Sequence, residues 1–119
     1  MLIGISEGQF WRYEVDEDQD GYLVRMRDLT TGELEASEAK LFRTAAVAFS
    51  YAELSATFDR YAAARIGGED EAEALLDDVG AHQELFLALS RRLGDEGLAA
   101  ATLKAWDEHE AVAARRLLH

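Results

Sequence analysis

The stretch from residue 41 to residue 66 constrains the fold most, because it predicts one long helix that is apolar on two sides. It reads LFRTAAVAFSYAELSATFDRYAAARI, contains no Gly or Pro and is rich in Ala, so its helix propensity is high throughout. One apolar stripe consists of Val47, Tyr51, Leu54, Phe58 and Tyr61, and a second consists of Phe42, Ala45, Phe49, Ala52 and Ala56. At about 100° per residue the two stripes lie well over a right angle apart. We therefore expect a central helix with packing neighbours on two sides.

The first 37 residues predict an antiparallel β-meander. Apolar and polar residues alternate in two runs, residues 9–15 and 22–27, and both runs are rich in aromatic or β-branched residues. A polar loop that ends in Gly separates the runs and predicts a hairpin. A short strand at residues 33–36 and another at residues 2–5 would bring the meander to three or four strands.

The rest of the chain predicts helices, so the fold class is α+β. Ser37 precedes the acidic Glu38 and is expected to cap the central helix. Glycines follow the central helix and the second helix, where each would end a helix. No linker divides the chain, which is expected to form a single domain over residues 1–119. The predicted elements are a β-meander over 1–37, a central first helix over 38–66, a second helix over 69–93 and a third helix over 95–118.

The charge of the chain limits the partners that it can have. Its formal net charge is −12, with ten acids against four bases in residues 1–40 and nine against two in residues 69–96. A nucleic acid or an anionic membrane surface is not expected as a partner, because no basic stripe is present to neutralise phosphates. A basic protein partner is compatible with this charge. The absence of Cys fits a reducing compartment, and we expect the protein to be cytoplasmic.

The sharpest local motif is a run of acids at alternate positions, which is the pattern of a calcium loop. Asp16, Asp18 and Asp20 are followed by Gly21, as in the first half of an EF-hand loop. The twelfth position of such a loop supplies a bidentate carboxylate, but Arg27 stands there. The flanking residues predict strands rather than helices. We therefore expect a solvated acidic hairpin loop and no metal, with a calcium-stabilised domain as the alternative.

His82 is the one ionisable residue in the apolar seam of the second helix, between Val79 and Phe86. One interpretation makes it the base of a small enzyme whose carboxylates come from other elements. The other makes it a core-edge residue with a hydrogen-bond partner. Glu84 is two residues away and so on a different face of a helix, and the chain has no phosphate-binding loop or dinucleotide fingerprint. We therefore expect no cofactor and favour a non-enzymatic function.

Aromatic residues at the start of the first alternating run are the candidate interaction residues. Phe10 and Trp11 would form a binding surface if either lay on a sheet face away from the helices. Together with the two-sided helix and the acidic charge, they lead to the hypothesis of an interaction or regulatory protein. Such a protein would bind a protein partner, and a homodimer formed through helices would bury any excess apolar surface.

Overall fold

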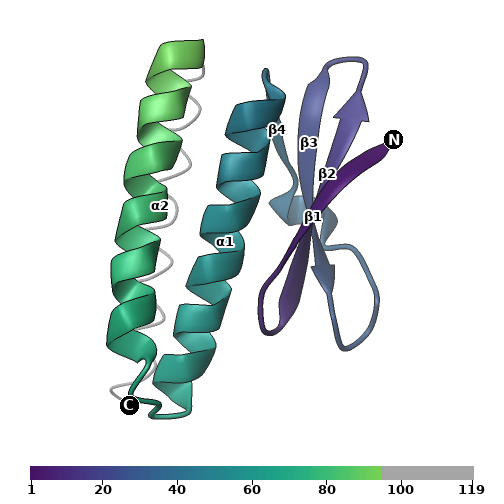
Figure 1. The fold of residues 1–119 in the computed structure, drawn as a ribbon. Helices are drawn as coiled ribbons and strands as arrows, with labels where there is room; N and C mark the ends of the chain where they lie inside the picture. The colour runs from purple at the N-terminus through teal and green to yellow at the C-terminus, as the bar shows by residue number, and fades with distance from the viewer. Residues whose placement is uncertain (95–119) are drawn as a thin grey trace.

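The computed structural model describes residues 1–94, which form a four-stranded sheet and two long helices. The elements are β1 (Leu2–Glu7), β2 (Trp11–Asp18), β3 (Gly21–Asp28), the 3₁₀ helix η1 (Ala36–Glu38), β4 (Lys40–Phe42), α1 (Ala45–Ile66) and α2 (Ala72–Leu93). The sheet order is β1-β2-β3-β4, and every neighbouring pair is antiparallel. α1 lies between the sheet and α2 (Figure 1). The other face of the sheet is covered by no described element.

The predicted α+β class and the order of sheet before helices are confirmed. The structure has four strands, the larger of the two predicted numbers. It shows two α-helices among the described residues, where the sequence predicts three in the whole chain. The predicted third helix, over 95–118, lies outside the described residues.

The predicted hairpin is formed by β2 and β3, and its register brings the alternating residues of the two runs onto common faces. Tyr13 pairs with Met26 and Val15 pairs with Val24, and these side chains share the face that packs against α1. The strands continue further toward the turn than expected, because Asp18 still pairs with Gly21. The hairpin turn is therefore short.

The segment before α1 differs from the prediction. The helix begins at Ala45 rather than at residue 38, and its N-cap is Thr44, whose side chain accepts a hydrogen bond from the Val47 amide. Ser37 lies instead in η1. The fourth strand is β4, at Lys40–Phe42, and the strand predicted at 33–36 is reduced to an isolated antiparallel bridge between Leu34 and Arg27 of β3.

Packing of one aromatic side chain explains this difference. Pairing of β4 with β3 places Phe42 opposite Tyr22 and buries it completely. There the Phe42 ring contacts the rings of Tyr51 and Phe86, at centroid distances of 5.1 and 5.9 Å. The residues from 38 to 44 fit an amphipathic helical pattern when they are considered alone. The strand, however, brings Phe42 into the core between the sheet and the helices, and this tertiary contact outweighs helix propensity.

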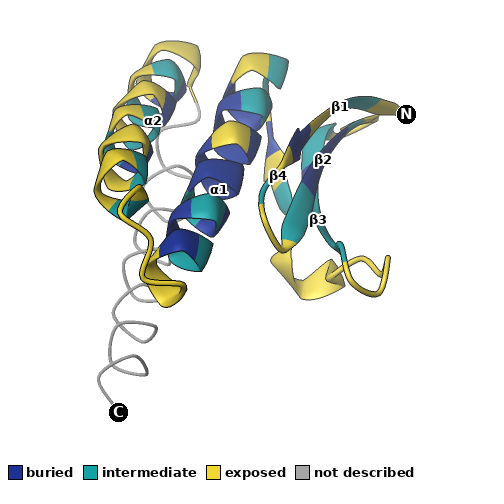
Figure 2. Ribbon diagram, turned by 60° about the horizontal axis from the view of Figure 1, so that its bottom comes forward, coloured by how far each residue is buried: buried dark blue, intermediate teal, exposed yellow. Residues whose placement is uncertain are grey.

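The two-sided burial of α1 is confirmed. Tyr51, from the first stripe, contacts Phe86 of α2, with ring centroids 5.8 Å apart. Phe49, from the second stripe, lies against Gly4 of β1, where a Cβ atom would collide with the Phe49 ring. Figure 2 shows buried residues along much of α1, whereas α2 is exposed on its outer side.

α2 begins at Ala72, three residues later than the prediction, and ends before Gly94. Gly94 has a φ of 83°, in the left-handed region that glycine adopts readily, so the predicted stop signal is confirmed. Val79, Phe86 and Ser90 are the buried residues of this helix.

Candidate functional site

A cleft of about 790 Å³ lies between α1, the core-facing side of β2 and β3, and the segment from Glu35 to Lys40. This volume falls within the roughly 300–1,000 Å³ range of pockets that hold small ligands or a few side chains. Residues from three separate parts of the chain meet there, and the half-exposed Phe10 and the exposed Ile66 also line it.

Aromatic rings form much of the wall of the cleft. Tyr13 and Trp11 come from β2, Tyr51 and Phe58 from α1, and Phe10 from the turn between β1 and β2. Tyr13 and Tyr51 are buried, whereas Phe10 is 49% exposed. The two predicted interaction residues, Phe10 and Trp11, thus lie together at one cleft. Trp11 lies on the face of the sheet that packs against the helices, and not on the opposite face.

Asp59 of α1 holds the turn that carries Phe10 and Trp11. Its Oδ2 atom accepts hydrogen bonds from the backbone amides of Phe10, at 2.8 Å, and Trp11, at 3.0 Å. A Cβ atom at Gly8 would collide with the Asp59 carboxylate, so only glycine permits this approach. Arg60 adds a hydrogen bond from Nη1 to the Glu7 carbonyl, at 2.8 Å.

Sequence reasoning did not identify Asp59 as a site residue. The available signal was the scarcity of acids around it, because Asp59 is one of only two acids in the stretch 41–66. A buried acid in a helix needs a hydrogen-bond partner, and the amides of a neighbouring turn provide it.

Two residues that carry hydroxyl groups, Ser55 of α1 and Tyr13 of β2, line the cleft. Ser55 is 2% exposed, and its Oγ atom has no hydrogen-bond partner in the part of the chain that the structure describes. Thr57, two residues later, donates its hydroxyl to the Glu53 carbonyl at 2.8 Å. The Ser55 hydroxyl is therefore a buried polar group that is left for another partner.

Tyr13 supplies the second hydroxyl. Burial raises the pKa of its phenol, and the nearby charge of Asp59 raises that pKa further. The phenol therefore stays protonated across the physiological pH range. It can donate one hydrogen bond and accept another.

The charges at the cleft are mainly negative. Glu35 and Glu38 are exposed at its mouth, Asp59 lies inside, and Lys40 is half-buried. Over residues 1–94 the ion pairs lie elsewhere, on the outer face of the sheet. None of these pairs involves the acids of the cleft.

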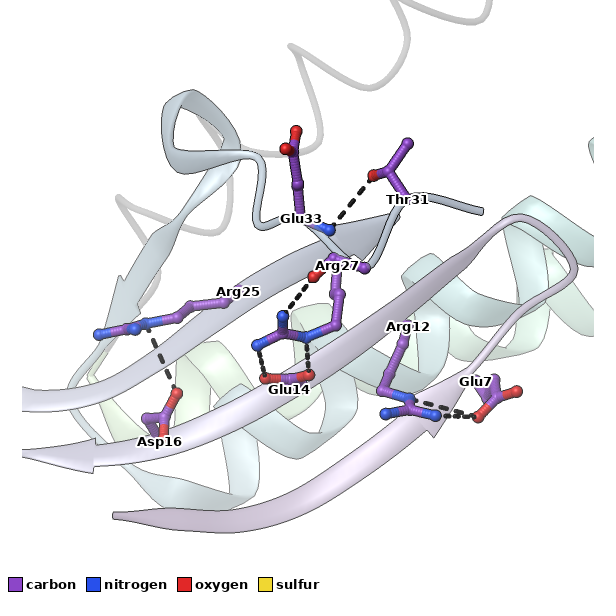
Figure 3. Close-up of polar contacts among 9 residues, drawn as sticks. Glu7, Arg12, Glu14, Asp16, Arg25, Arg27, Thr31 and Glu33 are labelled. Atoms are coloured by element: carbon purple, nitrogen blue, oxygen red, sulfur yellow. Dashed lines mark hydrogen bonds and ion pairs between the residues drawn. The ribbon is translucent and has the colours of Figure 1, made fainter. Parts of the chain in front are cut away.

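Those outer-face pairs form a charged ladder across the strands (Figure 3). Arg27 binds the Glu14 carboxylate with its Nε at 2.6 Å, and Arg25 lies 3.5 Å from Asp16. The hydrogen bond from Arg27 lowers the pKa of Glu14, against the opposing effect of burial. These two contacts pair four buried or half-buried charges, those of Glu14, Asp16, Arg25 and Arg27.

The other candidate sites from the sequence lie away from the cleft. His82 is half-buried on α2 and does not line the cleft. No described hydrogen bond or ion pair joins it to a carboxylate within residues 1–94.

The acidic hairpin places its three aspartates in different settings. Asp16 lies on the outer face beside Arg25, Asp18 accepts a hydrogen bond from the Gln19 amide, and Asp20 is exposed at the turn. Among residues 1–94, no three His, Asp or Glu side chains are grouped so that they could hold a metal ion.

Neither described helix has the length and apolar character that a membrane span requires. Comparison with known proteins gave no match: no family model, no curated protein and no solved structure is similar to this chain.

Proposed function

We propose that this chain is a non-enzymatic interaction module that binds a protein partner by holding an apolar part of the partner in the cleft. The observation that carries the proposal is the aromatic wall of a cleft of about 790 Å³, with Phe10 half-exposed at its edge. Aromatic side chains are enriched at the centres of protein interfaces, because they bury a large area at a small cost in side-chain entropy.

The polar groups of the cleft fit binding better than catalysis. Asp59 is engaged by two backbone amides, so its carboxylate has a structural task. The cleft contains no His among its described lining residues. The proposal keeps the cytoplasm as the site of action, because a chain without Cys needs no oxidising compartment.

Self-association through helices is the second element of the proposal. Leu76, Leu85 and Leu93 of α2 are 38–50% exposed, which leaves apolar surface that a second copy would bury. Sedimentation equilibrium at micromolar concentration is expected to give a mass near twice 13.2 kDa. A monomer mass at that concentration would remove self-association and leave the cleft proposal intact.

Site-specific photo-crosslinking tests the cleft. A benzophenone amino acid replaces Phe10, and the variant is produced in cells of the source organism and irradiated. The expected result is a discrete crosslinked protein partner. Ala62→Trp, which places a large side chain in the cleft from α1, is expected to abolish this product.

The matched control is Ala81→Trp, the same substitution at an exposed position of α2. The crosslink is expected to persist with this control. A crosslink that survives Ala62→Trp, or no protein crosslink at all from residue 10, would contradict the proposal. Circular dichroism of both tryptophan variants shows whether each has folded.

A further inference from the structure

We infer that the cleft is selective for a positively charged side chain, so that its occupant is a partner segment with an arginine or lysine between apolar residues. This inference rests on the proposed function and adds the chemistry of the segment that is bound. Three features of the cleft carry it: its unneutralised acids, its aromatic rings and a buried hydroxyl without a partner.

The acids give the cleft an excess of negative charge. Glu35, Glu38 and Asp59 contribute three carboxylates, against the single cation of Lys40. The ion pairs of residues 1–94 are on the outer face of the sheet, so no arginine of that face neutralises these acids. A bound cation would therefore meet attraction at both the mouth and the interior, and a bound carboxylate would meet repulsion.

The rings of the wall favour the same charge. A guanidinium or ammonium group is attracted to the face of Trp, Tyr or Phe by about 0.5–2 kcal/mol, depending on how far the pair is desolvated. Trp11, Tyr13, Tyr51 and Phe58 all line the cleft. Their rings would also pack against the aliphatic part of an arginine or lysine and against its apolar neighbours.

The buried hydroxyl supplies a specific acceptor. Ser55 Oγ is shielded from solvent and unpartnered among the described residues, although Ser55 lines the cleft. A buried polar group without a partner costs about 1–3 kcal/mol, and a donor from a ligand would recover that loss. The N–H groups of arginine and lysine are donors without acceptor capacity, and they therefore suit an oxygen that lies near carboxylates.

The size of the cleft sets the length of the segment. A volume of about 790 Å³ admits a few side chains but no folded element. A short peptide with one central charge is therefore a sufficient probe. The peptide Ac-Leu-Arg-Leu-NH₂ and its citrulline analogue differ in charge but hardly in shape, and free spermidine tests a cation without apolar flanks.

The experiment measures each probe on the full chain by calorimetric titration, with amide NMR spectra to locate binding. The arginine peptide is expected to bind about tenfold more tightly than the citrulline peptide and than spermidine. Its largest shifts are expected at the cleft residues Trp11, Tyr13 and Ser55. In the Glu35→Gln/Glu38→Gln variant the preference for arginine over citrulline should fall to about threefold or less.

The control is Glu17→Gln/Glu84→Gln, which makes the same charge change at two exposed acids that do not line the cleft. It should keep the tenfold preference. Equal binding of the two peptides at the cleft would overturn the charge selectivity while leaving an apolar binding site. Tighter binding of spermidine than of the arginine peptide would assign the cleft to a free polyamine and overturn the proposal that a segment of a protein partner binds there. The absence of shifts at the cleft with every probe would refute both this inference and the proposed function.

Discussion

Replacement of Phe42 by alanine is expected to cause the largest loss of stability of any substitution proposed for this chain. The side chain is completely buried and contacts the rings of Tyr51 and Phe86, so it joins the sheet to both helices. Truncation of a buried Phe to Ala costs about 3–5 kcal/mol. The loss of two aromatic pairs, each worth about 0.5–1.5 kcal/mol beyond burial, places the expected cost at the upper end of that range.

The measurement is urea denaturation followed by circular dichroism, with thermal unfolding as a second assay. A loss of this size should lower the melting temperature by more than about 10 °C. Because small domains have only about 5–15 kcal/mol of total stability, Phe42→Ala could be unfolded before the titration begins. Phe42→Leu keeps most of the volume and should remain measurable, at a cost of about 1–2 kcal/mol.

The matched control is the neighbouring residue Leu41. In β4 it points to the opposite face from Phe42 and is 41% exposed, so Leu41→Ala is expected to cost less than about 1 kcal/mol. The difference expected between Phe42→Ala and Leu41→Ala arises because neighbouring side chains of a strand point to opposite faces. Equal losses for the two alanine variants would refute the register of β4, and a loss below about 1 kcal/mol for Phe42→Ala would refute the role of the aromatic cluster.

Three further substitutions test separate parts of the structure. Thr44→Ala removes the N-cap of α1 and should cost about 1 kcal/mol in urea denaturation, whereas Ser37→Ala, at the cap position that the sequence predicts, should have almost no effect. Glu14→Gln should lower the melting temperature by a few degrees at neutral pH. Because the hydrogen bond from Arg27 lowers the pKa of Glu14 in the folded state, its stabilising effect is present above the ordinary Glu pKa of about 4.3. The difference from the wild type should therefore shrink as the pH falls through the lowered value, and a difference that grows in acid would be inconsistent with the ion pair. Ser55→Ala removes a buried hydroxyl without a partner and should raise the free energy of unfolding by about 1 kcal/mol, and a loss of stability would show that the hydroxyl is satisfied.

The sequence predicts the regular parts of this fold because their periodicity is carried by many residues. The alternation around Tyr13 and Val15 determines which side of β2 is buried, and a slip by one position would expose that whole set. The two stripes of α1 likewise specify its central place. Here local pattern and tertiary packing favour the same structure.

Residues 33–44 were not predictable in the same way, because their local pattern conflicts with their packing. Ser37 and Glu38 resemble a helix start, and the apolar residues that follow fit a helical period. The structure places Phe42 in a strand because pairing with β3 brings its ring to Tyr51 and Phe86. Tyr51 and Phe86 belong to other elements, α1 and α2, so the sequence around Phe42 does not predict these contacts.

The cleft was also beyond prediction from hydropathy, because its aromatic residues have the same alternation as residues of a closed core. What distinguishes them is the position of α1 over the sheet. Side-chain hydrogen bonds join α1 to β1, to the turn after it and to the first residue of β2. Glu53 accepts from Ser6 at 2.6 Å, Asp59 accepts from the amides of Phe10 and Trp11, and Arg60 donates to the Glu7 carbonyl.

Glycine permits this one-sided attachment. A side chain at Gly4 would collide with Phe49 of α1, and a side chain at Gly8 would collide with Asp59 of α1. Glycine at these two positions therefore permits a closer approach of α1 than a residue with a Cβ atom would. Met26, near the end of β3, remains half-buried against the core. Met26 lines the cleft together with Phe10 and Asp59, and the close approach at Gly8 is what lets Asp59 hold the turn that carries Phe10. Gly8→Ala should displace the Asp59 carboxylate, weaken its hydrogen bonds to the amides of Phe10 and Trp11 and so change the shape of the cleft.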